Sequence, residues 1–198
     1  MKLFHSPASP FARKVVASAI ALDLDRQIEL VRVNPHVSPP ELLAANPLSK
    51  IPCLVTSDGV GLFDSAVICE FLDSISTAAV LFPPSGKARW RALKRQAMAD
   101  GLLDAAVLCR LEGRKPREEA RDATIARQKA AIARTLDVFE GDAVHPSVDI
   151  GTISLACALG YLDFRFADEP WRPGHPKLAA WMEAFGKTPC IARTPHHE

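Results

Sequence analysis

The sequence predicts a two-domain α/β protein, in which a small domain with a mixed four-stranded sheet precedes a domain made almost entirely of helices. Short strand-like runs alternate with amphipathic helical runs in the first part of the chain. A proline-rich segment, AVLFPPSGK, then interrupts both patterns, and beyond it apolar residues recur at helical spacing. We therefore expect the sheet domain in residues 1–77, a linker in 78–86 and the helical domain in 87–198.

The first domain reads as a βαβ unit followed by a ββα unit. Its expected elements are a strand over 1–5, a helix over 10–22, a strand over 27–33, a short helix in PPELLAANP, a hairpin of CLVTS and GVGLF around Asp58-Gly59, and a helix that opens at Ser65. Strands joined through a helix pair in parallel by a right-handed crossover, whereas a hairpin adds antiparallel partners. The sheet is therefore expected to be mixed.

The second domain is expected to be a helical bundle with a buried central helix. Its expected helices lie over 87–112, after Pro116, within VDIGTISLACALGYLDFRF and over 176–187. Asp149 is placed to cap the apolar helix, with Thr152 three positions later in a capping-box arrangement. The segment TPHHE is expected to trail away, with His196 and His197 in a frayed tail.

Composition excludes several classes of function. The chain holds 24 Lys and Arg against 23 Asp and Glu, so nothing draws it to nucleic acid or to an acidic membrane surface. Its apolar runs stop short of the roughly 18 residues that a membrane span needs, and MKLFHSPASP lacks the apolar core of a signal peptide. We expect a soluble cytoplasmic protein with no nucleic-acid or membrane partner.

The cysteines and histidines show no metal-binding or disulfide pattern. Five cysteines occur without a CxxC pair, and the six histidines lack the spacing of metal ligands. Buried free thiols and no metal site are the expectation. Cys53 follows Pro52 closely enough to lie near a bound sulfur, although a place in the inert core is favoured for it.

Ser9 stands where the first strand gives way to the first helix. It is a good N-cap, and Pro10 occupies the first helical position, which proline favours. Its hydroxyl could also donate to a sulfur, and such a bond together with the helix dipole would stabilise a thiolate. The alternative is that Ser9 only caps the helix.

Two further loops carry groups suited to a small peptide. Proline cannot donate to a sheet, so Pro52 lies at an edge or begins the strand CLVTS, and a cis Ile51-Pro52 bond would leave backbone groups free to pair with an extended peptide. Asp64 and Ser65 begin the next helix, where unpaired N–H groups favour a carboxylate. Helix capping is the alternative for this pair.

These motifs resemble those of the bacterial glutathione S-transferases of the serine type. The matching residues are Ser9, Pro10, Phe11 and Arg13 in SPFARK; Asn46, Pro47, Lys50, Ile51 and Pro52 in NPLSKIP; and Asp64, Ser65 and Ile68 in FDSAVI. GYLDFR in the helical half is similar to a stretch of one bacterial subgroup. The resemblance thus covers nearly the whole chain and implies a thioredoxin-like N-terminal domain.

The resemblance also implies roles for the site residues. Ser9 would be the catalytic residue that stabilises the glutathione thiolate, and Phe11 would border the pocket for a small hydrophobic electrophile. Lys50 would reach the glycyl carboxylate, Ile51 beside Pro52 would pair with the cysteinyl backbone, and Asp64 with Ser65 would hold the γ-glutamyl end. The family usually has Glu or Gln at the position of Asp64.

The implied activity is a transferase that uses glutathione as co-substrate in detoxification. The resemblance further suggests a homodimer formed through the helical face that carries Arg89, Trp90 and Met98. Two alternatives stay open: a glutathione-dependent peroxidase or disulfide reductase, and a non-catalytic interaction or regulatory protein of the same fold. Serine has no sulfur for a mixed disulfide, so thiol exchange through position 9 is disfavoured.

Overall fold

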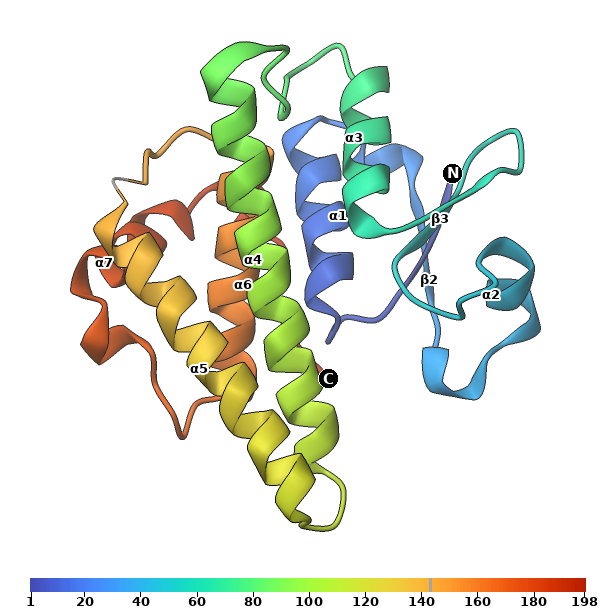
Figure 1. Cartoon of the computed structure of the whole chain (residues 1–198). Helices are drawn as coiled ribbons and strands as arrows, with labels where there is room; N and C mark the ends of the chain where they lie inside the picture. The colour runs from blue at the N-terminus through green and yellow to red at the C-terminus, as the bar shows by residue number, and fades with distance from the viewer. Residues whose placement is uncertain (143) are drawn as a thin grey trace.

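The structure, a computed structural model, describes residues 1–142 and 144–198 (Figure 1). Its elements in chain order are β1 (Lys2–His5), α1 (Pro10–Ala21), β2 (Glu29–Arg32), α2 (Pro40–Ala45), β3 (Cys53–Val55), β4 (Gly61–Leu62), α3 (Ser65–Ile75), α4 (Gly86–Gly113), α5 (Glu119–Gly141), α6 (Ile150–Arg165), α7 (Pro176–Phe185) and α8 (Pro189–Ala192). Figure 1 shows α1 and α3 beside the long helix α4, with the strands on one side and α5 and α7 on the other.

The four strands form the mixed sheet that the sequence predicts, in the order β2-β1-β3-β4. β1 pairs in parallel with β2 and antiparallel with β3, and β3 pairs antiparallel with β4. In this register Phe4 stands opposite Cys53, and Leu54 stands opposite Leu62. The end of β1 therefore lies beside the start of β3.

Side chains that alternate along the strands divide the apolar residues between two cores. Leu3 and Leu54 join the main core, which α1, α3 and the helical domain share. Phe4 and Cys53 point to the opposite face, where they pack against Leu42 of α2. The face that carries α1 and α3 thus joins the sheet to the helical domain.

The helical domain is built around α6, as its apolar sequence predicts. Ile150 through Leu159 are all buried. The predicted capping box is present, because Thr152 N–H donates to Asp149 Oδ1 at 2.8 Å and Asp149 N–H donates to Thr152 Oγ1 at 2.9 Å. The segment before α4 anchors the same helix, since Leu81 is buried and its carbonyl accepts from Ile150 N–H at 3.0 Å.

The observed elements differ from the expected ones mainly at their ends. The strands are shorter, and the four-residue helix α8, Pro189–Ala192, was missed by the sequence reasoning. The division at 1–77, 78–86 and 87–198 stays a prediction, with α3 ending at Ile75 and α4 beginning at Gly86. Within the described residues, every helix is too short or too polar to serve as a membrane span.

Candidate functional site

The three loops with predicted site residues meet at one edge of the sheet. The loop to Ser9 leaves the end of β1, and Pro52 precedes the strand that begins opposite Phe4. β4 runs antiparallel to β3, so Asp64, two residues beyond Leu62, returns to the level of Pro52. Ser9, Pro52 and Asp64 thus stand around the same end of the sheet, although each lies far from the others in sequence.

Ser9 occupies the N-cap of α1 with its hydroxyl still able to donate. The Ala12 N–H donates to Ser9 Oγ at 3.2 Å, and Pro10 is the first residue of the helix. A hydroxyl accepts through its lone pairs and donates through its own O–H. The capping bond therefore leaves the O–H free, so capping and thiolate binding are compatible roles. Ser9 is half-buried and reachable from the surface.

The segment before β3 is shaped by Asn46, which is buried. Its side-chain amide donates to the Lys50 carbonyl at 2.9 Å, and its Oδ1 accepts from Leu48 N–H at 3.0 Å. The side chain of Lys50 is exposed, and Pro52 is buried. The Ile51–Pro52 peptide bond is cis. Asn46 thereby holds the turn that presents Lys50 and Ile51 at the sheet edge.

The start of α3 brings an acid and a hydroxyl to the same edge. Asp64 caps the helix by accepting from Ala66 N–H at 3.0 Å, and its side chain is exposed, whereas Ser65 is buried. Asp104 of α4 faces this region: burial is the main cause that raises the pKa of its carboxyl, and the charges of Lys50 and Asp64 also act on it. The charges at the sheet edge thus influence a carboxyl group of α4.

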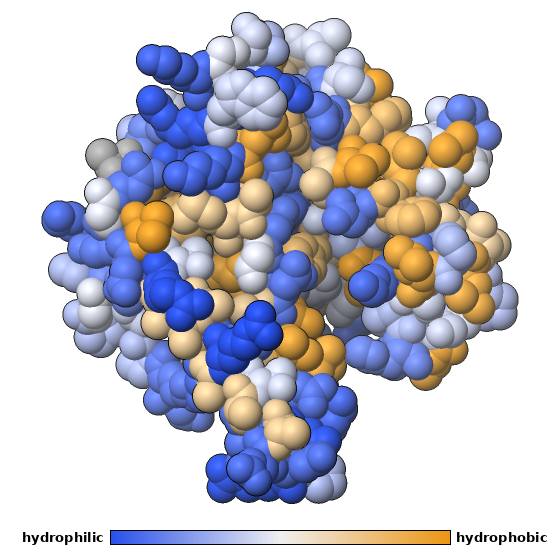
Figure 2. Space-filling model, viewed as in Figure 1, coloured by the Kyte–Doolittle hydropathy of each residue, from blue (hydrophilic) through white to orange (hydrophobic). Residues whose placement is uncertain are grey.

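Phe11 is the second residue of α1 and lies in the first turn of the helix. Its ring is half-buried and packs against the main core, and the ammonium of Lys14 lies 5.9 Å from the ring centroid. Figure 2 shows the surface hollowed between the lower half of α4 and the sheet domain. The role of Phe11 at an electrophile pocket stays a prediction.

Lys14 and Asp100 form an ion pair that the sequence reasoning missed. Lys14 of α1 is fully buried, and its Nζ donates to both carboxylate oxygens of Asp100 of α4 at 2.8 and 2.7 Å. Burial raises the pKa of the Asp100 carboxyl, and Lys14 opposes that rise. The pair ties the helix that Ser9 caps to the first helix of the second domain.

All five cysteines are free and buried. Burial raises the pKa of Cys53 and raises those of Cys69 and Cys157 to about 11. A reactive thiol needs the opposite shift and an accessible sulfur. The place of Cys53 in the core under α2 agrees with the interpretation of it as inert.

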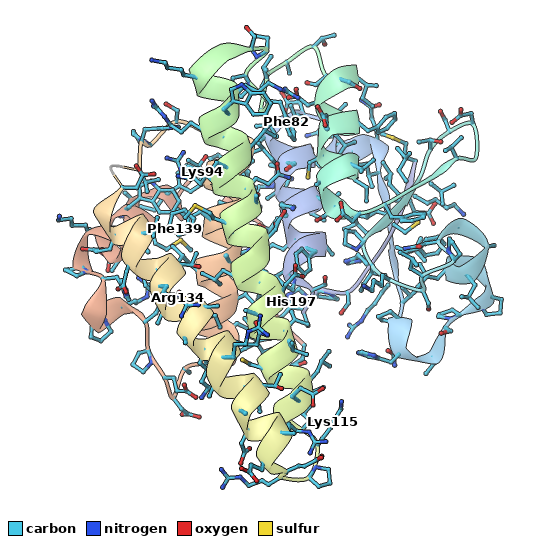
Figure 3. All side chains as sticks on the ribbon, in the orientation of Figure 1. Phe82, Lys94, Lys115, Arg134, Phe139 and His197 are labelled. Carbon is cyan, nitrogen blue, oxygen red and sulfur yellow. The ribbon has the colours of Figure 1, made fainter. Side chains whose placement is uncertain are left out.

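The C-terminal segment packs against the helical domain, so the expected frayed tail is wrong for His196. Its ring stacks on Phe164 with centroids 5.5 Å apart and meets Tyr161 edge-on at 5.6 Å. Apolar ring faces on α6 provide the docking surface, and the ring also approaches the backbone of Pro7. His197, which Figure 3 labels, lies at the level of the lower half of α4. The segment therefore lies beside the loop that leads to Ser9.

Arg13 of α1 also contacts the C-terminal segment. Its Nε donates to Thr194 Oγ1 and its guanidinium to the Ile191 carbonyl, both at 3.5 Å. Gly160 of α6 leaves the space for this side chain, because a Cβ at Gly160 would lie 2.2 Å from a guanidinium nitrogen of Arg13. The small residue in GYLDFR thus lets α1 and the C-terminal segment meet.

Acidification is expected to release this segment. Burial first, and then the charge of Arg13, lower the pKa of His196 from 6.5 to about 4. The released imidazole binds a proton that the docked one does not, so docking is strongest above pH 6.5 and weakens as the pH falls toward 4. The loss approaches about 1.4 kcal/mol per pH unit across that range. Hydrogen exchange of the 194–198 amides and the NMR titration of the ring would measure it.

His196→Phe serves as the control, because phenylalanine keeps the ring packing and cannot titrate. The variant should keep its docked segment down to pH 4. A His196 ring that titrates near 6.5 in the native protein would contradict this prediction.

Two cavities lie away from the candidate site. One of about 410 Å³ lies between α4 and α5, where Figure 3 labels Lys94 and Phe139 of its lining. The other, of about 240 Å³, lies under α1 beside Arg193. Neither is lined by Ser9 or by the predicted glutathione-binding residues.

Comparisons with known proteins agree with this arrangement. Residues 8–75 match the family model described as the glutathione S-transferase N-terminal domain, and residues 122–184 match that of the C-terminal domain. The uncharacterized GST-like protein YibF of Escherichia coli K12 is 34% identical over 199 residues, which cover 98% of each chain.

Two crystal structures of a glutathione transferase family member from Pseudomonas fluorescens Pf-5 resemble the chain closely. One has bound glutathione, is 39% identical, covers 100% of this chain and 99% of that one, and gives a TM-score of 0.93. The other, with bound S-(propanoic acid)-glutathione, is also 39% identical, covers 100% of both chains and gives a TM-score of 0.89. With its thioredoxin-like sheet domain followed by a helical domain, the chain belongs to the glutathione S-transferase family.

Proposed function

We propose that this protein binds glutathione along the sheet edge and uses the Ser9 hydroxyl to stabilise the thiolate for attack on a small hydrophobic electrophile. The observation that carries the proposal is the free O–H of Ser9 at a helix start, beside two other loops suited to a peptide. The two Pseudomonas fluorescens structures support it, because they hold glutathione and an S-substituted glutathione.

Each loop has a part in the proposed complex. Ile51 and Pro52 pair with the cysteinyl backbone, and Lys50 reaches the glycyl carboxylate. Asp64 and Ser65 hold the γ-glutamyl end, where the exposed carboxylate of Asp64 suits an ammonium group and the N–H groups of α3 suit a carboxylate. Phe11 borders the electrophile.

Ser9 then acts on the sulfur itself. A hydrogen bond to a charged partner contributes roughly 1.5–3 kcal/mol and a helix N-terminus roughly 0.3–1 kcal/mol. At about 1.4 kcal/mol per unit, these shift the thiol pKa down from about 8.5 by one to three units. The thiol proton leaves to solvent, the sulfur bonds to the electrophilic carbon, and the leaving group departs with its electron pair.

Calorimetry can test binding and ionisation together. Titration of glutathione in buffers with different ionisation enthalpies should show heat and the release of a proton, approaching about one per bound ligand at neutral pH. S-methylglutathione is the matched control, since it has no thiol proton and should bind without release. Absence of heat with glutathione would overturn the proposal.

The burial and the raised pKa values of the protein's thiols favour conjugation over disulfide exchange. Exchange needs an accessible thiolate, whereas Cys53, Cys69 and Cys157 are buried and have raised pKa values. Turnover compared on an aryl halide, a hydroperoxide and a mixed disulfide separates conjugation, peroxide reduction and disulfide exchange. Glutathione binding without turnover on any of them would favour a regulatory role.

We also propose a cytoplasmic homodimer. Buried free thiols suit a reducing compartment. On the first turns of α4 the Trp90 side chain is 69% exposed, which is an unusual position for a large apolar group unless a partner covers it. Light scattering should give twice 21.5 kDa, and a mass of 21.5 kDa would exclude the dimer.

A further inference from the structure

The cavity of about 410 Å³ between α4 and α5 concentrates positive charge. Arg91, Lys94 and Arg95 form its α4 wall, and within the described residues Asp142 is the only acid that lines it. Three cations and one acid give the wall a net charge of +2, which exceeds the +1 of the whole chain. Small-molecule sites typically have volumes of roughly 300–1,000 Å³. The cavity therefore has both the size and the charge of a site for an anionic molecule.

Arg95 is the buried cation of this wall. The residue is 3% exposed, and its guanidinium has two partners: Nη2 donates to Asp142 Oδ2 at 3.2 Å, and Nη1 lies 3.2 Å from His145 Nε2. Its Nε finds no hydrogen-bond partner among the described residues. A buried charge is costly unless it is paired and hydrogen-bonded, and the Asp142 side chain is 51% exposed, so this ion pair is a weak one. The charge of Arg95 is thus incompletely compensated within the part of the chain that the structure describes.

Apolar side chains form another part of the wall. Met98 of α4 lines the cavity together with Val138 and Phe139 of α5, and Figure 3 labels Phe139 with Lys94 on the neighbouring helix. Val138 is 52% exposed. A bare inorganic anion leaves this apolar surface in contact with water, whereas an organic group covers it. The cavity thus suits an anion that is attached to a small apolar body.

We propose that this cavity binds a phosphate monoester with a small apolar body. A phosphate monoester carries roughly −1.5 to −2 charges at neutral pH and has three strong acceptor oxygens, which complement the net charge and the N–H donors of the wall. Guanidinium groups match phosphate with two parallel hydrogen bonds. The apolar body packs against Met98, Val138 and Phe139.

The inferred site goes beyond the proposed function and does not depend on it. Neither Ser9 nor the predicted glutathione-binding residues line the cavity. It lies beside the proposed dimer face and shares Met98 with that face, whereas Trp90 is not part of its lining. A phosphate monoester and glutathione should therefore bind to the protein at the same time.

Three probes separate the charge of the ligand from its apolar body. Phenyl phosphate has both, inorganic phosphate has only the charge, and benzyl alcohol has only the ring. In calorimetry phenyl phosphate should bind at least about tenfold more tightly than either of the others. Equal binding of inorganic phosphate would overturn the ligand class, because the apolar wall would then contribute nothing. Equal binding of benzyl alcohol would overturn the role of the cations.

Methionine methyl signals in NMR locate the bound probe. Met98 lines the cavity, whereas Met182 is buried in the main core. Phenyl phosphate should shift the methyl signal of Met98 and leave that of Met182 in place, with or without saturating glutathione. Phenyl phosphate that displaces glutathione binds at the sheet edge instead, and this result would overturn the inference. Glutathione that fails to bind ends only the proposed function, because the Met98 shift is read without it.

Two variants and a control test the contacts. Arg91→Gln removes an exposed cation, so the fold should survive, and it should weaken phenyl phosphate binding about tenfold. Asp142→Asn should tighten binding, because the acid that competes for Arg95 is gone. Arg127→Gln is the matched control: this exposed arginine of α5 does not line the cavity, and its loss should leave binding within about twofold. Equal losses in Arg91→Gln and Arg127→Gln would assign the effect to overall charge and overturn the inference.

Discussion

Replacing Asp100 with leucine is expected to lower the free energy of unfolding by about 3–5 kcal/mol, because it leaves the ammonium of Lys14 buried without a counterion. Lys14 has no exposed surface, and Asp100 accepts from its Nζ with both oxygens. Lys14→Met should cost less, since Asp100 keeps 22% of its side chain exposed and a raised pKa lets it take up a proton. Urea unfolding measures both changes.

The double variant Lys14→Met/Asp100→Leu distinguishes the charge from the packing. Apolar side chains of similar size often replace a buried ion pair with little loss, so the double variant should recover most of the stability that Asp100→Leu loses. Lys94→Met on the exposed face of α4 is the control, with an expected change within about 0.5 kcal/mol. If the double variant loses as much free energy of unfolding as the two single variants together, the ion pair does not stabilise the fold.

Replacing Ser9 with glycine is expected to lower kcat/KM for conjugation roughly 10- to 100-fold, because the hydrogen bond to the thiolate is lost. Glycine is chosen because at an N-cap it costs only a few tenths of a kcal/mol, so the helix survives. The pH profile of kcat/KM should move upward as the thiol pKa returns toward about 8.5. Steady-state kinetics with an aryl halide would measure both effects.

Ser9→Thr is the matched control, since threonine keeps a hydroxyl and still caps a helix. It should retain the native pH profile even if its methyl group slows turnover. A Ser9→Gly variant with a native pH profile would show that the serine serves only as a cap, and the source of thiolate stabilisation would then lie in the helix N-terminus.

The features that could be predicted from the sequence depend on short-range chemistry. Ser9, Asp64 and Asp149 each accept from a backbone N–H two or three residues later, so their capping roles follow from local residue types. The mixed character of the sheet follows in the same way from one crossover and one hairpin, whereas the pairing of β3 with β1 was not predicted. The roles of Lys50, Ile51 and Phe11 toward glutathione stay predictions.

The features that were missed join residues far apart in sequence. Lys14 and Asp100 are 86 positions apart, and nothing in either helix alone marks the lysine as buried. His196 sits among polar residues that normally indicate a loose end, yet Phe164 and Tyr161 hold its ring.

The burial of all five cysteines makes the folded chain nearly silent toward thiol reagents. A colorimetric sulfhydryl titration of the protein mixed with glutathione therefore reports the tripeptide alone. A changed rate of glutathione modification on complex formation would reveal occupancy directly, with no label and without modification of the protein's own cysteines.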